Sequence, residues 1–244
     1  MNRLLVALSA SVAVLALAPA ANATILLPSQ GGVAFSPIDA STRGTLLASI
    51  ETLETDPNPA IASYTAFFRS AVYRNTMDTL DFYFQVAVNS IDLGDEIFNL
   101  TASSFAGYQV DALVDRTDFD GAGIFTAVSN PNLDLNEPAG STTTTSRSGG
   151  LGSVVRADFG QNGLEAAGQT SATYIFRTNA TDFNFGGSFT TQDGSVASRA
   201  NYQPIGAPVP EPATWAMMLI GFGMIGFGLR RREKVTTRVR YSMA

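Results

Sequence analysis

The reactive side chains of this sequence are carboxylates, hydroxyls and arginines, because its 244 residues include neither histidine nor cysteine. The absence of histidine excludes Ser-His-Asp and Cys-His catalysis and removes the imidazole ligand of zinc, copper and haem sites. The absence of cysteine excludes disulfides, thiolate nucleophiles and iron–sulfur clusters. Any catalytic or metal-binding chemistry must therefore rest mainly on oxygen atoms.

The densest group of carboxylates is formed by Asp111, Asp115, Asp118 and Asp120, of which the last three are the calcium candidates. Carboxylate oxygens at this spacing resemble part of a calcium-binding loop, but the EF-hand frame would place Arg116 at the first ligand position and Ala127 at the last. We therefore expect solvated loop carboxylates here, with a calcium site at a strand end as the alternative. The sequence predicts no cofactor.

Glycoside hydrolysis requires two carboxylates at a fixed separation. Residues 24–210 contain 19 acidic residues, so pairs arise by chance and their presence is not informative. We expect no catalytic role, and a carboxylate-based glycoside hydrolase is the less favoured alternative.

Carbohydrate binding is a further alternative, since aromatic rings stack on sugars. The candidate rings are Tyr64, Tyr73, Tyr83, Tyr108, Tyr174 and Tyr202. They serve equally well as cross-strand partners in a sheet. Ice binding is the third alternative, but it needs regular rows of threonine, whereas the threonines of residues 141–146 are clustered in one stretch. A carbohydrate-, calcium- or ice-binding module thus stays open.

The elements that must position these groups are strands. Residues 80–88 alternate apolar and polar side chains, and residues 67–74 precede them across a short turn, which predicts a hairpin. Further expected strands cover residues 44–52, 96–101, 108–115, 123–128, 153–159, 172–178 and 182–190. Turn residues separate nearly all of them, which predicts one all-β domain over residues 24–191, a β-sandwich or jelly roll.

Three segments are not assigned to strands alone. Residues 44–52 also fit a helix, because Leu46, Ile50 and Leu53 share a helical stripe. Residues 129–150, rich in proline, serine and threonine, are expected to form a long loop. Residues 192–208 have little apolar content and are expected to form a flexible linker.

The N-terminal residues 1–23 have the pattern of a secretory signal peptide. Arg3 precedes an uncharged apolar run, and Ala21 and Ala23 supply the small residues of an A-x-A cleavage site. We therefore expect the secretion machinery to export the chain and signal peptidase to cut it after Ala23.

A second apolar run lies at the other end, over residues 213–229. Seventeen helical residues extend about 25 Å, which is short but workable for a bilayer core of about 30 Å. Arg230, Arg231 and Arg232 follow directly, and positive charge favours the cytoplasmic side. We expect a transmembrane helix here, with residues 233–244 as a basic cytoplasmic tail.

Charge differs between these regions. Residues 24–210 contain 19 acidic residues and 8 arginines, a net charge of −11, and no lysine. An acidic domain without a basic stripe makes nucleic acid an unsuitable partner. The expected exported domain is therefore acidic, while the C-terminal tail is basic.

Residues 209–232 resemble the PEP-CTERM sorting segment in its PEPxxWA form. The resemblance rests on the order of Pro210-Glu211-Pro212, Trp215-Ala216, a glycine-rich apolar helix and an arginine cluster, about a tenth of the chain. Two prolines hold the backbone extended around Glu211, whose charge offers a recognition point for an arginine.

The resemblance implies an exported protein of a Gram-negative bacterium. In that family a membrane enzyme, exosortase, recognises the segment and cleaves near the Pro-Glu-Pro. The proteins are linked to exopolysaccharide and the cell-surface matrix, and some ice-binding proteins end in the same segment. We therefore expect a membrane-anchored precursor facing the periplasm, which is then moved to the cell surface or extracellular matrix.

Overall fold

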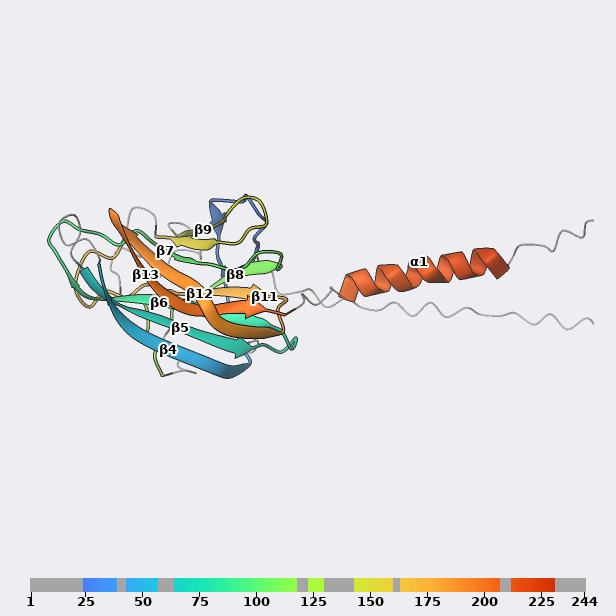
Figure 1. Cartoon of the computed structure of the whole chain (residues 1–244), viewed down its shortest axis with the longest axis horizontal. Coiled ribbons are helices and arrows are strands. Elements are labelled where there is room, and N and C mark those ends of the chain that lie inside the picture. Colours follow the sequence, from blue (N-terminus) through green and yellow to red (C-terminus); the bar gives the residue numbers. More distant parts are fainter. Residues whose placement is uncertain are drawn as a thin grey trace, which may run out of the picture.

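The computed structural model describes residues 24–38, 43–56, 64–117, 123–129, 143–159, 163–206 and 212–230. Two β-sheets pack face to face into a sandwich, and one helix, α1 (Pro212–Arg230), follows them in the chain (Figure 1). The predicted all-β sandwich is therefore confirmed.

Sheet A has the strand order β1-β8-β11-β6-β5-β4, and β3 also pairs with β8. Its strands are β1 (Thr24–Ile25), β3 (Ser36–Pro37), β4 (Thr45–Thr55), β5 (Tyr64–Arg74), β6 (Leu80–Ile91), β8 (Val110–Asp115) and β11 (Thr173–Thr178). All of these pairs are antiparallel except β3 with β8. The predicted hairpin is thus confirmed as β5–β6.

Sheet B has the strand order β13-β12-β7-β10-β9-β2. Its strands are β2 (Val33–Ala34), β7 (Asn99–Ala102), β9 (Thr144–Arg147), β10 (Val155–Asp158), β12 (Asp182–Asp193) and β13 (Ser195–Ile205). Every pair in this sheet is antiparallel. The two long strands β12 and β13 form a hairpin at one edge.

The central strand β6 is buried on both faces, although its sequence alternates. Phe82 and Phe84 point into the space between the sheets, as the period-two pattern predicts. Asp81, Tyr83 and Gln85 lie on the opposite face and are also fully buried. This second face must therefore be covered by other parts of the chain.

The core between the sheets is aromatic. Phe84 and Phe189 meet edge to face with ring centroids 5.3 Å apart, and Phe159 stacks on Tyr174 at 5.7 Å. These geometries are the favoured ones for aromatic pairs. Every side chain of this core lies between Leu26 and Tyr202. The sandwich therefore contains everything its own core needs, and we expect it to fold without α1.

Residues 123–129 cover the outer face of sheet A and do not form the predicted strand at 123–128. Phe125 packs with Tyr73 and Tyr83 in a second apolar cluster. The backbone N–H of Thr126 donates to Gln85 Oε1 (3.1 Å), and Gln85 Nε2 donates to the Thr126 carbonyl (2.6 Å). The apolar pattern thus reflects packing on a sheet face, and a side-chain amide replaces the strand ladder.

The predicted linker over residues 192–208 is also wrong, because most of it is β13. Asp193-Gly194 forms the tight turn from β12 into β13, and Gly194 takes a positive φ of 59°. An Asp-Gly pair is a strong hairpin signal. Only Ala197, Asn201 and Pro204 of this strand are buried, so the strand needs little apolar content. The β domain therefore extends to Ile205.

Two other expectations are settled by the sheets. Residues 45–52 of the segment 44–52 belong to β4, so the helical alternative is wrong; pairing with β5 over almost the whole strand outweighs the weak helical stripe. The loop expected at 129–150 contains β9, whose Thr145 and Arg147 are buried between neighbours. Residues 130–142 of that loop lie outside the described residues.

Candidate functional site

The helix α1 contains the apolar run that the sequence predicts as a membrane segment. It begins at Pro212, and proline suits the first helical position because the N–H it lacks would be unpaired there. Arg230 ends the helix, at the start of the arginine cluster. The helix therefore coincides with the expected segment at 213–229.

The described side chains of α1 expose apolar surface. Each large one is 54–70% exposed: Met217, Met218, Leu219, Ile220, Phe222, Met224, Ile225 and Phe227. Figure 1 shows the helix apart from the two sheets. None of the helices in the described part of the chain has the length and apolarity needed to cross a membrane. The membrane span at 213–229 therefore stays a prediction.

Most residues of the sorting motif and the cleavage site are not described. Four of them lie in α1, and only the backbone of these four is described: Pro212, Trp215, Ala216 and Arg230. The other predicted site residues lie outside the described residues: Ala21, Ala23, Asp118, Asp120, Pro210, Glu211, Arg231 and Arg232. Cleavage after Ala23 would leave every described strand intact, since β1 begins at Thr24.

Asp115, the described member of the calcium candidates, is committed to contacts within the protein. It forms an ion pair with Arg43, and its Oδ1 accepts hydrogen bonds from the Thr117 N–H (2.9 Å) and hydroxyl (2.7 Å). Among the described residues, no group of three or more acidic side chains is arranged to hold a metal ion. Asp115 therefore fixes the end of β8.

A buried ion pair crosses the outer face of sheet A. Arg177 on β11 donates from Nη2 to Asp81 Oδ2 on β6 (2.9 Å) and from Nε to both carboxylate oxygens (3.1 Å). Asn75 donates a further hydrogen bond to Asp81 Oδ1 (2.7 Å). Burial acts against the charged guanidinium, but the carboxylate of Asp81 outweighs it and raises the pKa of Arg177. The pair is a structural brace between two central strands.

Arg147 on β9 is buried and donates its hydrogen bonds to backbone carbonyls. Its guanidinium donates to the carbonyls of Leu26 (3.0 Å), Phe105 (2.8 Å), Tyr108 (2.7 Å) and Gly152 (2.8 Å). Burial lowers the pKa of Arg147 from its usual value. The side chain ties the first residues of the domain to two loops, the one that contains Phe105 and Tyr108 and the one that contains Gly152.

Acidic residues meet at one end of the sandwich, where β4 and β12 finish. Asp193 is 94% buried, and its Oδ2 has no hydrogen-bond partner among the described residues. Burial raises the pKa of Asp193, and the carboxylates of Asp95, Asp56 and Glu96 act in the same direction, while a backbone hydrogen bond at Glu96 opposes it. We therefore expect the stability of this end of the sandwich to depend on pH.

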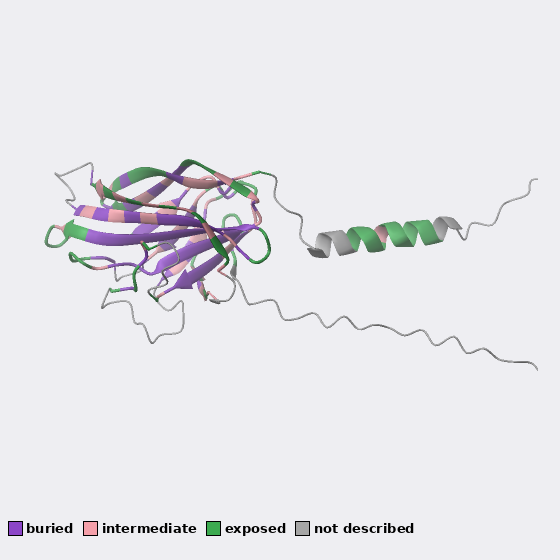
Figure 2. Cartoon of the chain, turned by 90° about the horizontal axis from the view of Figure 1, so that it is seen from below, coloured by how far each residue is buried: buried purple, intermediate pink, exposed green. Residues whose placement is uncertain are grey.

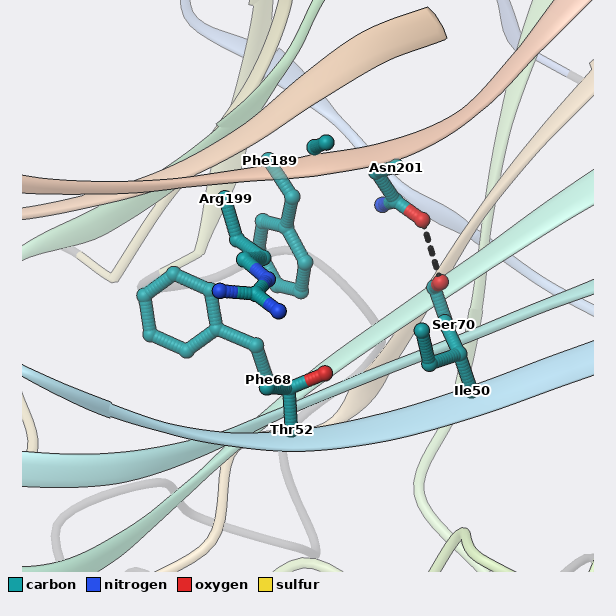
Figure 3. A pocket seen from close by; sticks show the side chains of 8 residues that line it. Ile50, Thr52, Phe68, Ser70, Phe189, Arg199 and Asn201 are labelled. Atoms are coloured by element: carbon teal, nitrogen blue, oxygen red, sulfur yellow. Dashed lines mark hydrogen bonds between the residues drawn. The ribbon is translucent and has the colours of Figure 1, made fainter. Parts of the chain in front are cut away.

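A small cavity lies at the open edge of the sandwich, between β4–β5 and β12–β13. It holds about 10 Å³, enough for a single water molecule. Phe68 and Phe189 form its apolar wall, and Arg199 lies at its mouth (Figure 3). Ser70 donates to Asn201 Oδ1 (2.5 Å), while Asn201 Nδ2 has no partner among the described residues. A cavity of this size suits a bound water better than a substrate.

The tyrosines that were candidates for sugar binding are mostly in the core. Four have no more than 1% exposure: Tyr64, Tyr73, Tyr83 and Tyr174. Tyr108 and Tyr202 are less buried, and their hydroxyls donate to the carbonyls of Gly206 and Ser49. These six rings therefore do not form one exposed platform.

The buried arginines and their partners were not predicted. The available signal was a lone charge inside an apolar strand, such as Asp81 in Leu80–Val86 or Arg177 after Ile175-Phe176. Such a charge is almost never buried unless it is paired. That rule identifies the residues that need partners but does not name the partners.

The comparison with protein-family models finds the PEP-CTERM protein-sorting motif at residues 208–232. The match spans Pro210-Glu211-Pro212, the helix α1 and the arginine cluster, which confirms the resemblance. No curated protein and no solved structure matches the chain. The motif implies the class of exported, membrane-sorted proteins that exosortase processes. The match does not extend to the sandwich.

Proposed function

We propose that the chain is a cell-surface or extracellular-matrix protein, delivered by its C-terminal motif into a layer rich in exopolysaccharide. The sandwich is the part that remains outside the cell, and it has no catalytic activity of its own. The signal peptide directs export, and α1 holds the precursor at the inner membrane until exosortase cuts near the Pro-Glu-Pro.

The match at residues 208–232 is the observation that carries this proposal. The exposed apolar side chains of α1 support it, because apolar surface of this extent is unfavourable in water and favourable in lipid. The prolines of the Pro-Glu-Pro sequence disfavour a helix at the cleavage region, which suits binding by a processing enzyme.

The contacts of the sandwich favour a structural role over catalysis. The buried carboxylate of Asp81 is saturated by Arg177 and Asn75, and Asp115 is held by Arg43. The described cavity has room for one water molecule. These carboxylates stabilise strands and are poorly placed to serve as an acid–base pair.

Substitution Glu211→Gln tests the role of the motif. It removes the charge that an arginine of the enzyme would bind, but it keeps both prolines and the helix. We expect export and membrane retention to persist while the full-length precursor accumulates in cells that contain exosortase. The measurement is the size of the protein in membrane and extracellular fractions.

The matched control changes the other end of the helix. Replacing Arg230, Arg231 and Arg232 with Gln removes the main positive-inside signal. We expect impaired retention or orientation of the precursor, with Glu211 still present. Normal processing of the Glu211→Gln variant would overturn the proposed recognition of Glu211.

A further inference from the structure

The strand β4 is a long free edge of sheet A. It pairs with β5 alone among the described strands and ends the strand order (Figure 1). The opposite edge of the described sheet carries the two-residue strands β1 and β3. Native proteins usually shorten, charge or cover such edges, because their free N–H and C=O groups attract another strand. The eleven residues of β4 are therefore an unusual feature.

The outward-facing backbone groups of β4 follow from its hydrogen-bond pattern. The Asp56 N–H donates to the Tyr64 carbonyl at the end of the β4–β5 ladder. In an antiparallel ladder every second residue bonds to the partner strand, so Ser49, Glu51 and Leu53 direct their N–H and C=O groups away from β5. The Tyr202 hydroxyl reaches the Ser49 carbonyl at 3.3 Å. The three residues therefore have six outward N–H and C=O groups, and this long hydrogen bond engages one of them.

The side chains of β4 do little to repel a partner strand. The strand contains neither proline nor lysine, and its outward Leu53 is 48% exposed. Its two carboxylates are paired within the chain, Glu51 with Arg69 (2.6 Å) and Glu54 with Arg199 (3.4 Å). The edge strand β13, in contrast, carries Pro204 and Arg199, which discourage pairing.

The sequence of β4 complements itself. Ile50 is the central residue of Thr45–Thr55, so a two-fold axis at Ile50 aligns all eleven residues of two antiparallel copies. In that register Ser49 faces Glu51 of the second copy, and both present outward N–H and C=O groups. Leu47, at a bulge in β4, faces Leu53. No carboxylate lies opposite another carboxylate.

We propose that β4 pairs with β4 of a second copy of this chain and joins the two A sheets into one continuous sheet. Tyr202 is then a competitor, because its hydroxyl already donates to the Ser49 carbonyl that the second strand would use. A single strand pair buries less surface than a standard interface, so the dimer is weak in dilute solution. Confinement at one surface raises the effective concentration and favours it. The inference does not depend on processing of the C-terminal motif.

The test uses residues 24–206, which contain the whole core. Analytical ultracentrifugation over a wide concentration range should show a monomer–dimer equilibrium. Amide hydrogen exchange should slow with concentration at Ser49, Glu51 and Leu53, while Ile50 and Thr52, already bonded to β5, should not change. A wild-type protein that stays monomeric throughout would overturn the proposal.

Three variants locate the interface. Ser49→Pro removes an outward N–H that the β4–β5 ladder does not use, so it should give a monomer with an unchanged melting temperature. Ser49→Ala is the matched control and should dimerise as the wild type does. Tyr202→Phe removes the competing hydroxyl and should strengthen dimerisation by at least twofold.

Leu53→Lys serves as a second edge variant if Ser49→Pro fails to fold. It keeps the backbone groups and places a lysine on the edge, which should also give a monomer. Dimerisation that persists in a folded Ser49→Pro or Leu53→Lys protein would assign the contact to another surface and contradict the proposal.

Discussion

The sandwich and the helix α1 differ in the exposure of their apolar side chains. In the sandwich, Phe82, Phe84 and Phe176 are fully buried between the sheets. In α1, Leu219 and Phe222 are more than half exposed. Figure 2 shows this contrast as buried strands and a largely exposed helix.

The difference shows that the two regions depend on different surroundings. The sandwich satisfies its apolar residues internally and needs nothing beyond residues 24–206. The helix offers apolar surface that the sandwich does not cover, so its stability must come from an environment outside the domain. The location of the protein and the stability of its fold should therefore respond to separate mutations.

The largest effect is expected from removing the helix. A chain that ends at Gly206 should unfold at the same temperature as the full-length sandwich, because no core residue is lost. It should also disappear completely from the membrane fraction. Fractionation and thermal unfolding of the two chains measure both outcomes.

The control for this truncation is Ile220→Lys in the full-length chain. A lysine at the centre of a membrane helix costs about 3 kcal/mol. It should therefore weaken membrane retention without changing the unfolding of the sandwich. Unchanged retention after both alterations would contradict the division of roles between the two regions.

The next effect concerns the sandwich alone. Arg177→Met leaves the carboxylate of Asp81 buried without its charge partner, which typically destabilises a protein by about 3–5 kcal/mol. Arg156→Met removes the half-exposed pair with Asp158 and should cost about 1 kcal/mol or less. Urea unfolding of both variants gives the comparison. Equal losses would show that burial of the Asp81–Arg177 pair carries no special weight.

The smallest effect depends on pH. The pKa of Asp193 is raised in the folded protein, so the folded state binds the proton more tightly than the unfolded state. Stability from this group is present below the unfolded pKa, about 3.9, and is lost as the pH rises through the folded pKa. Asp193→Asn cannot ionise, and its stability relative to the wild type should rise over that interval.

Urea unfolding of wild-type and Asp193→Asn proteins from pH 3 to pH 7 provides the measurement. Asp92→Asn removes an exposed carboxylate elsewhere on the domain and is the matched control. A constant difference between Asp193→Asn and the wild type at every pH would contradict the role of Asp193.

Patterns within one segment predicted the fold well. The alternation in residues 80–88 placed Phe82 and Phe84 in the core, and the short turn before it identified the β5–β6 hairpin. Local apolar content predicts two segments wrongly: residues 123–128 pack on a sheet face without forming a strand, and the linker expected over residues 192–208 is mostly the polar strand β13. Both errors arise because the sequence of a segment does not show which other part of the chain it packs against or pairs with.

Contacts between distant segments could not be predicted. Asp81 and Arg177 are separated by 96 residues in the sequence. Arg147 donates hydrogen bonds to backbone carbonyls of two distant segments. No local pattern encodes those pairings. The sorting segment is the opposite case, since its order of Pro-Glu-Pro, apolar helix and arginines is contained in one short stretch, and the family match confirms it.

The central claim is that the motif at residues 208–232 directs processing of an exported sandwich. The most direct measurement is the intact mass of the protein recovered from native cells with and without exosortase. We predict a mature chain that begins at Thr24 in both strains and loses α1 only where exosortase is present. A protein that keeps α1 and remains in the inner membrane in both strains would contradict the account.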